Sequence, residues 1–194
     1  MSDSKIVLAS TSVFRKMLLE KLSVEFATGS PDIDESTVDN EAPEALVKRL
    51  SEAKARALSE DYPENLIIGS DQVACIDDEI LGKPGNFDNA LLQLRKASGK
   101  VVTFYTGLSL LNSANGHVQT LCEPFKVHFR QLNDEQISRY LNHEQPYNCA
   151  GSFKSEGYGV SLFERLEGDD PNTLIGLPLI QLIKMLDNEG VHIP

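Results

Sequence analysis

The side chain best placed for chemistry in this 194-residue sequence is Asp71. It follows the apolar run at residues 66–68 and the small pair Gly69 and Ser70, so we expect a carboxylate where a buried strand emerges. A carboxylate at such a strand end can hold a metal ion or accept a proton, because a low-dielectric rim strengthens its field. A turn or capping aspartate has the same local sequence, so this stretch alone leaves both interpretations open.

Other charged residues in the sequence have the types needed to act beside Asp71. The candidate acids are Glu35, Asp71 and Glu156, and the candidate cations are Arg15, Lys16, Lys54, Lys83 and Lys154. Two carboxylates with several cations suit metal-assisted phosphate chemistry, since Mg²⁺ binds one or two carboxylates together with substrate phosphates. Lys54 lies on an apolar helical stripe, where it either extends its ammonium to water or directs it into a cleft.

Other kinds of site have weaker support. The four histidines lack metal-ligand spacing and form no Ser/His/Asp order. The three cysteines are odd in number and lack CxxC spacing, so we expect no zinc site and no disulfide framework, and we expect a reducing cytoplasm. The glycine-rich stretch at residues 149–159 matches neither a dinucleotide fingerprint nor a P-loop.

The composition is that of a globular protein with ample core. Hydrophobic residues make up 41% and charged residues 24% of the chain. No apolar run approaches the roughly 20 residues of a membrane span, and residues 1–5 do not begin a secretory signal. The net charge of −11 argues against binding to a nucleic acid strand. A small anion could still bind at a local cluster of cations, together with a divalent metal.

Hydrophobic periodicity and turn residues predict an α/β fold with a mixed sheet. Ser12 is a good N-cap for a helix that carries Val13, Phe14, Met17, Leu18 and Leu22 on one stripe, and its first turn would offer N–H groups to an anion. We expect strands at residues 6–8, 25–28, 66–68, 73–76, 79–81, 101–111 and 117–130. We expect helices at residues 13–22, 42–58 and 86–97, and shorter ones opening near residues 133 and 178.

Seven short motifs occur along the chain in an order similar to that of a known family. They are residues 8–15, the Asp34–Glu35 loop, residues 53–55, 69–72 and 82–84, Thr106–Gly107, and residues 176–178. In these motifs the sequence resembles the Maf nucleotide pyrophosphatases. The resemblance implies a Maf/ITPase-like α/β fold, a mixed twisted sheet with flanking helices in two lobes around a central cleft, spanning residues 1–194 as one domain.

The resemblance also implies an activity and its residues. Maf enzymes hydrolyse a nucleoside triphosphate to a monophosphate and diphosphate with a divalent cation such as Mg²⁺ or Mn²⁺. By position, Asp71 matches the family's proton acceptor and, with Glu35, its metal site. The phosphate-binding positions are Ser12, Arg15, Lys54 and Lys83. The resemblance further leads us to expect a cytoplasmic enzyme that forms a homodimer and does not bind a membrane.

Three positions differ from the commonest Maf branch and resemble the branch that hydrolyses 7-methyl-GTP. They are Phe14, Gln72 and Glu156, the last within the run at residues 151–157. Methylation at N7 makes guanine cationic, and an aromatic face attracts a cationic ring. Glu156 could accept hydrogen bonds from the guanine N–H groups, and Gln72 could contact the base edge. Phe14 also fits ordinary helix packing beside Met17 and Leu18.

The sequence therefore leaves three candidate functions open. The first is hydrolysis of 7-methyl-GTP to 7-methyl-GMP and diphosphate, which would prevent the incorporation of modified nucleotides. The second is the same hydrolysis of dTTP or UTP, against which only the three specificity positions argue. The third is a nucleotide-binding regulator of cell division without catalysis, a role associated with the family.

Overall fold

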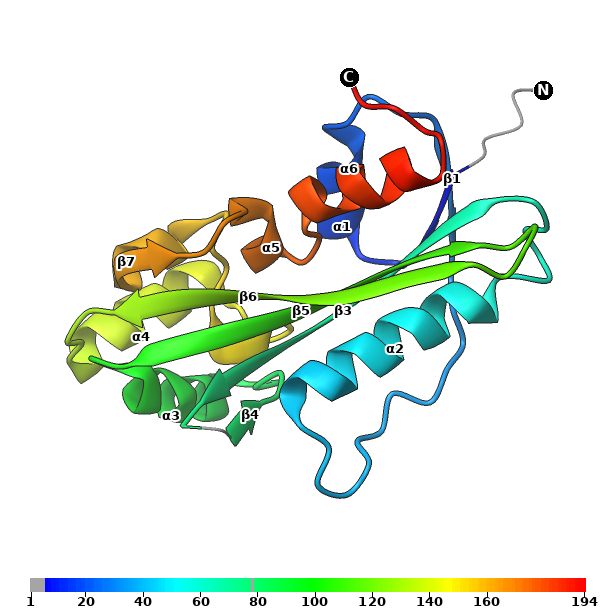
Figure 1. Ribbon diagram of the computed structural model, residues 1–194. Helices are drawn as coiled ribbons and strands as arrows, with labels where there is room; N and C mark the ends of the chain where they lie inside the picture. The colour runs from blue at the N-terminus through cyan, green and yellow to red at the C-terminus, as the bar shows by residue number, and fades with distance from the viewer. Residues whose placement is uncertain (1–5, 78) are drawn as a thin grey trace. The chain divides into compact units, whose positions relative to one another are not determined.

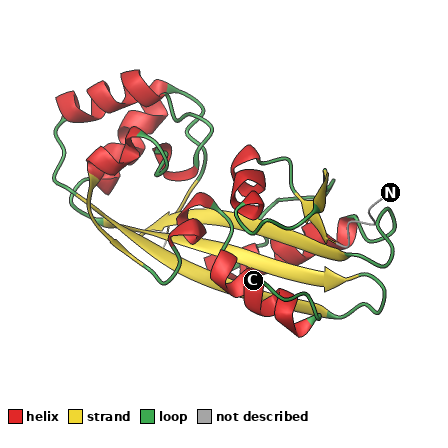
Figure 2. Cartoon of the chain, turned by 90° about the horizontal axis from the view of Figure 1, so that it is seen from above, coloured by secondary structure: helices red, strands yellow, loops and turns green. Residues whose placement is uncertain are grey.

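The computed structural model describes residues 6–77 and 79–194 and contains a mixed seven-stranded sheet with flanking helices (Figures 1 and 2). Its strand order is β2-β1-β3-β5-β6-β7, and β4 pairs with β3. This confirms the predicted fold class. The chain divides into two compact units. Among the described residues, the first unit comprises residues 6–72, 106–123 and 170–194, and the second comprises residues 73–77, 79–105 and 124–169. Three long strands, β3, β5 and β6, contribute to both units: Leu66–Ile76, Val101–Asn112 and Val118–Phe129.

The first unit is built on parallel strand pairing. β1 (Ile6–Ala9) pairs in parallel with both β2 (Phe26–Gly29) and β3. Parallel neighbours need crossover connections, and helices supply them. The helices of this unit are α1 (Val13–Glu20), α2 (Pro43–Ala57), α5 (Pro171–Ile175) and α6 (Leu179–Asn188).

The two faces of this part of the sheet carry different helices, because successive strand residues point to opposite sides. Leu66 and Ile68 pack with α1 and α6 in one core cluster. Ile67 lies between them in sequence and packs with α2 residues Ala55 and Leu58 in another. Figure 1 shows α1 and α6 together on one side of these strands and α2 on the other. Leu66 and Ile68 of β3 therefore face α1 and α6, and Ile67 faces α2.

Two glycines bring α2 against the sheet. A β-carbon at Gly69 of β3 would overlap the Ser51 carbonyl oxygen and lie 2.9 Å from the Ala55 amide nitrogen. A β-carbon at Gly107 of β5 would overlap the Val47 carbonyl oxygen. Both obstacles are helix backbone, which cannot move aside as a side chain can. Glycine at both positions therefore permits the close contact between α2 and the sheet.

The second unit contains the remaining short elements. They are β4 (Glu79–Leu81), α3 (Phe87–Ala97), α4 (Asp134–Glu144), the 3₁₀ turns η1 (Ala150–Ser152) and η2 (Tyr158–Leu162), and β7 (Phe163–Glu167). The helix predicted to open near residue 133 is α4, and a capping box at Asn133 and Gln136 begins it. Edge-to-face ring contacts join Phe153 to Phe104, Phe129 and Phe163 in the core of this unit.

Several local predictions were wrong or incomplete. β3 does not end at residue 68; it continues through Gly69 and Asp71, because residues 70–72 keep extended backbone and bond to neighbouring segments. The glycine-rich stretch forms η1 and η2, and α5 and β7 were not predicted. The strands predicted at residues 73–76 and 79–81 pair as an antiparallel hairpin of β3 and β4. Asp78 of its turn lies outside the described residues, as do residues 1–5 of the signal-peptide prediction.

None of the helices in residues 6–77 and 79–194 has the length and apolarity needed to cross a membrane.

The close packing of α2 on β3 gives a stability prediction. We expect Gly69→Ala to lower the free energy of unfolding by about 1–3 kcal/mol, because the new methyl group forces two backbone segments apart. Urea unfolding measures the change. Gly82→Ala is the matched control, since a β-carbon at Gly82 meets nothing within 4 Å. Equal stability of the two variants would contradict the close-packing argument.

Candidate active site

A buried lysine joins the two carboxylates that the sequence indicated. Lys54 Nζ on α2 lies 2.6 Å from Asp71 Oδ1 and 2.8 Å from Glu35 Oε1. The Lys54 and Asp71 side chains are only 9% and 12% exposed, whereas the Glu35 side chain is 62% exposed. The Lys54 ammonium therefore points toward the two carboxylates and does not extend to water, which was the other interpretation of its place on the apolar stripe. An inner and an outer carboxylate face one cation.

The strand alternation explains why these groups meet. Asp71 is two residues beyond Gly69, so both point to the face covered by α2. Gly69 contacts the backbone of Ser51 and Ala55, the helix residues that flank Lys54 in sequence. The close approach at the glycine therefore brings the Lys54 side chain to Asp71. Glu35 reaches the same nitrogen from the segment between β2 and α2.

The opposite face of β3 holds the segment around α5. Ser70 Oγ donates a hydrogen bond of 2.9 Å to the Gly176 carbonyl oxygen, and Arg15 Nε donates another of 2.9 Å to the same oxygen. A single carbonyl thus fixes the inner end of the Arg15 guanidinium. Because Nε makes this bond, the two terminal nitrogens of Arg15 keep their donors for an anion.

Charge and burial act in opposite directions on Arg15. Burial lowers the pKa of Arg15 from its ordinary value, and the negative charges of Asp71 and Glu35 raise it in part. Those carboxylates are thus within electrostatic reach of the guanidinium. Ser12 is the N-cap of α1 as predicted, since its hydroxyl accepts a hydrogen bond of 3.4 Å from the Arg15 amide.

Gln72 also lies on the α5 face, and its neighbours settle the orientation of its amide. Nε2 donates to Thr106 Oγ1 and to the Thr173 carbonyl, both at 2.8 Å. Thr106 uses its own proton on the Thr173 carbonyl at 3.0 Å, so its oxygen must accept from Gln72. The amide nitrogen is therefore occupied by the protein. Oε1 makes no hydrogen bond among the described residues and remains an acceptor for a ligand.

Phe14 is 38% exposed on α1, and its neighbours Val13 and Met17 are more exposed still. Leu18 and Leu19 are the α1 residues that enter the core cluster. The predicted apolar stripe of this helix was therefore wrong in part, since Phe14 and Met17 do not belong to the buried core. Exposure leaves the Phe14 ring accessible to a ligand.

Two predicted site residues belong to the second unit. Lys83 is exposed in the loop between β4 and α3, where Gln93 and Asn89 donate hydrogen bonds to the carbonyls of Gly82 and Pro84. Glu156 is exposed between η1 and η2 and accepts a hydrogen bond from Ser155. Their roles beside Asp71 stay predictions.

The other candidate cations have local positions of their own. Lys154 pairs with Glu144 at 3.1 Å within the second unit. Lys16 is exposed and lines a shallow groove beside β2 in the first unit.

Asp71 and Glu35 are the two carboxylates of the candidate site that could bind a divalent cation. No group of three or more His, Cys, Asp or Glu side chains that could hold a metal occurs among the described residues. The Asp71 and Glu35 carboxylates nevertheless both contact one atom, the Lys54 ammonium nitrogen, so their oxygens lie close together. Two carboxylates suit Mg²⁺ when substrate phosphates supply further ligands. The donor set therefore fits a metal that binds together with a triphosphate.

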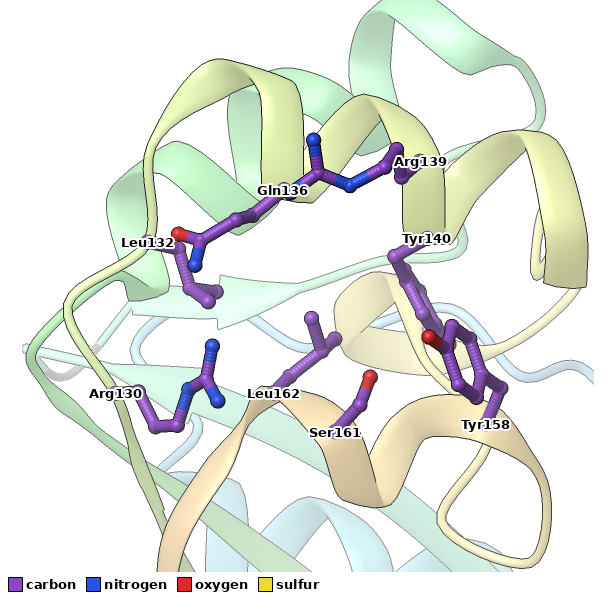
Figure 3. Close-up of a pocket in the computed structure, with 8 residues that line it drawn as sticks. All are labelled: Arg130, Leu132, Gln136, Arg139, Tyr140, Tyr158, Ser161 and Leu162. Atoms are coloured by element: carbon purple, nitrogen blue, oxygen red, sulfur yellow. The ribbon is translucent and has the colours of Figure 1, made fainter.

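The second unit also contains a separate cavity of about 190 Å³ between α4 and η2 (Figure 3). Its walls include Arg130, Gln136, Tyr140 and Ser161. In Figure 3 the Arg130 side chain points toward Leu162, whereas Arg139 extends along the outside of α4, so the two guanidinium groups do not converge. None of the residues predicted for catalysis lines this cavity.

Sequence reasoning missed several residues that arrange the site. The α5 segment is held by side-chain hydrogen bonds to its carbonyls at Thr173 and Gly176, and the donors include Ser70 and Thr106. Ser70, Thr106 and Gly176 lie inside the quoted motifs, but the motifs did not reveal these contacts. Arg49 of α2, which binds the loop that carries Glu35, had no signal in the sequence, because its partners lie 8 and 13 residues away in a segment without periodicity.

A helix-flanked mixed sheet with one buried and one exposed acid on a bridging lysine, and with an arginine at a helix start, is the framework of a phosphate-processing enzyme. The model of the family described as Maf-like protein matches residues 5–189. The chain belongs to the Maf family.

Two individual proteins show the range of the similarity. A protein of Colwellia psychrerythraea named 7-methyl-GTP pyrophosphatase is 59% identical over 188 residues, which cover 97% of this chain and 94% of that protein. The solved structure of a HAM1 protein from Coxiella burnetii covers 94% of this chain and 98% of that one, with a TM-score of 0.53 and 13% identity. The second likeness supports the fold alone.

The buried ion pair gives a second stability prediction. We expect Lys54→Met to lower the free energy of unfolding by about 3 kcal/mol, because it leaves the Asp71 carboxylate buried without a cation. Adding Asp71→Asn to this variant removes the uncompensated charge and recovers most of the loss. Urea unfolding of the two single variants and the double variant tests the coupling. Additive losses would show that the two side chains act independently.

Proposed function

We propose that this protein is a nucleoside triphosphate pyrophosphatase that hydrolyses 7-methyl-GTP to 7-methyl-GMP and diphosphate. The observation that carries the proposal is the ion cluster of Asp71, Lys54 and Glu35, which combines a candidate base with a candidate metal position. The name of the 59% identical relative supports the same substrate. Removal of modified nucleotides before polymerases use them is the role we infer.

In the proposed reaction Asp71 accepts a proton from a water molecule that attacks the α-phosphorus. The water oxygen bonds to this phosphorus, the bond from phosphorus to the bridging oxygen breaks, and diphosphate leaves. Lys54 holds Asp71 Oδ1 at 2.6 Å, so Oδ2 is the atom assigned to take the proton. A bound divalent cation would neutralise phosphate charge and lower the pKa of the attacking water.

Basic side chains would bind the phosphates in this scheme. Arg15 presents its terminal nitrogens, and the start of α1 next to Ser12 presents backbone N–H groups. Lys83 is assigned to the same phosphates from the family pattern. Each of these donors stabilises charge that builds on the phosphate oxygens in the transition state.

The hydrogen bonds of Gln72 support a role of its side chain in recognising the base. Its remaining atom is an acceptor, Oε1, and guanine offers N–H donors at N1 and N2. The exposed Phe14 ring is assigned to the cationic face of 7-methylguanine. Glu156 is assigned as a second acceptor for the base.

We also propose a cytoplasmic location and a homodimeric assembly, both from the family pattern. The three cysteines are free thiols, which agrees with a reducing compartment. Burial raises the pKa of the Cys122 thiol to about 11, so this cysteine is a poor thiolate and has no part in the proposed reaction.

Asp71→Asn tests the assignment of the base. We expect kcat to fall at least about a hundredfold, because the amide cannot accept the proton from water. We expect nucleotide binding, followed by isothermal titration with a non-hydrolysable analogue, to remain. Loss of turnover with retained binding separates a catalyst from a binding regulator. Unchanged turnover would remove Asp71 from the mechanism.

A substrate panel tests the assignment of the base pocket. We expect diphosphate release from 7-methyl-GTP to exceed release from GTP, UTP and dTTP, and a chelator to abolish it. We expect Phe14→Arg to lower the ratio of kcat/KM for 7-methyl-GTP over GTP by about tenfold, because it replaces a cation–π contact by repulsion. Met17→Arg, an exposed position on the same helix, is the control. Preference for UTP or dTTP would instead support the pyrimidine alternative, and activity that survives the chelator would refute the metal.

A further inference from the structure

The loop that carries Glu35 contains no helix or strand and is strongly acidic. We define this acidic loop as residues 30–42, between β2 and α2. Its carboxylates are Asp32, Asp34, Glu35, Asp39 and Glu41. Like charges in a short segment repel one another, so the loop requires cations to keep one conformation. The Glu35 side chain is largely exposed, and exposed ion pairs alone contribute little.

Arg49 of α2 binds this loop at two separate points. Its Nε and Nη2 atoms donate to the two oxygens of Glu41, each at 2.7 Å. Nη2 also donates at 3.0 Å to the carbonyl oxygen of Ser36, the residue next to Glu35. The planar guanidinium has the geometry for this fork, whereas an ammonium has not. One side chain thus joins the end of the loop to its middle.

Bonds inside the loop continue from these two points. The Glu41 side chain is 11% exposed and also accepts from the Val38 amide at 3.3 Å. The Ser36 amide donates to Asp34 Oδ1 at 2.9 Å. The segment from residue 34 to residue 41 therefore forms one bonded unit around Arg49. Lys54, five residues further along the same helix, then binds Glu35.

The charges of this pair hold at neutral pH. The hydrogen bond from Arg49 lowers the pKa of Glu41 below its ordinary value of 4.5, and Glu41 raises the pKa of Arg49. The order that this pair gives to the loop is therefore present above pH 4.5 and lost as pH falls through the lowered pKa of Glu41.

We infer that Arg49 is a positioning residue that orders the acidic loop and so places the Glu35 carboxylate beside Lys54 and Asp71. The inference about the loop stands on geometry alone, and its consequence for turnover rests on the proposed function. Arg49 acts through Glu35, because the hydrogen bonds of its Nε and Nη2 go to Glu41 and to Ser36, the residue next to Glu35. Turnover therefore depends on Arg49 only as far as it depends on the position of Glu35.

The same helix offers a matched control. Arg56 binds Glu52 one turn away, with both nitrogen-to-oxygen distances at 2.7 Å. That pair stays within α2 and contacts no part of the acidic loop. Arg56 and Glu52 form an ordinary exposed i,i+4 pair, and such a pair contributes little to stability. If Arg49–Glu41 were a pair of the same kind, removal of either arginine would have the same effect.

The first experiment measures loop order without metal or substrate. Hydrogen exchange of residues 30–42 is compared in the wild type, Arg49→Met, Arg49→Lys and Arg56→Met. We expect exchange in the loop to rise about tenfold or more in both Arg49 variants, since lysine keeps the charge but not the fork. We expect protection in β1 and β3 to stay unchanged in every variant, and Arg56→Met to match the wild type throughout. Equal loop exchange in Arg49→Met and Arg56→Met would overturn the inference.

The second experiment measures turnover of 7-methyl-GTP by the same variants. We expect Arg49→Met to lower kcat about tenfold or more and to change KM less than about threefold, because Glu35 is misplaced while the nucleotide contacts remain. A looser loop with unchanged kcat would overturn the positioning role. If the wild type hydrolyses no nucleotide, the proposed function fails, and the exchange experiment still decides the inference about the loop. If Arg49→Met loses protection in β1 and β3, the comparison is made with Arg49→Lys.

Discussion

The ammonium of Lys54 between the Asp71 and Glu35 carboxylates is the interaction on which the rest of the first unit depends. A lysine this deeply buried is stable only with carboxylates in contact, and buried carboxylates in turn require the cation. The helix must therefore lie against the strand, which explains why Gly69 occupies the contact with Ser51 and Ala55. The contact at Gly69 and the ion pair of Lys54 with Asp71 therefore both require α2 to lie close to β3.

The residues of Gly69-Ser70-Asp71-Gln72 point alternately to the two faces of β3. The odd residues meet α2, where Gly69 permits contact and Asp71 receives Lys54. The even residues meet the α5 segment, where Ser70 and Gln72 donate to backbone carbonyls. This division requires β3 to stay extended through all four residues. A strand that ended at residue 68 would not keep the two sets of contacts apart.

Much of the fold and of the candidate site could be predicted from the sequence, and each failed prediction has a physical reason. The order of strands and helices follows from apolar periodicity and caps such as Ser12 and Asn133, which are local signals. The association of Asp71 with Lys54 came from charge type and family resemblance. The length of β3 could not be predicted, because glycine and serine usually end a strand and only tertiary contacts keep them extended here. The amide orientation of Gln72 and the Arg49 contacts depend on partners distant in sequence.

The protein is strongly negative overall, whereas the charged side chains of the candidate site, Asp71, Glu35, Lys54 and Arg15, carry two charges of each sign. The chain carries a net charge of −11, yet its proposed ligand is an anion. Asp71 and Glu35 are matched by Lys54 and lie within electrostatic reach of Arg15, while Glu41 is matched by Arg49. The terminal nitrogens of Arg15 and the N–H groups at the start of α1 then remain for phosphates. Repulsion from surface carboxylates is screened over about 10 Å in salt, so these nearby donors decide whether an anion binds.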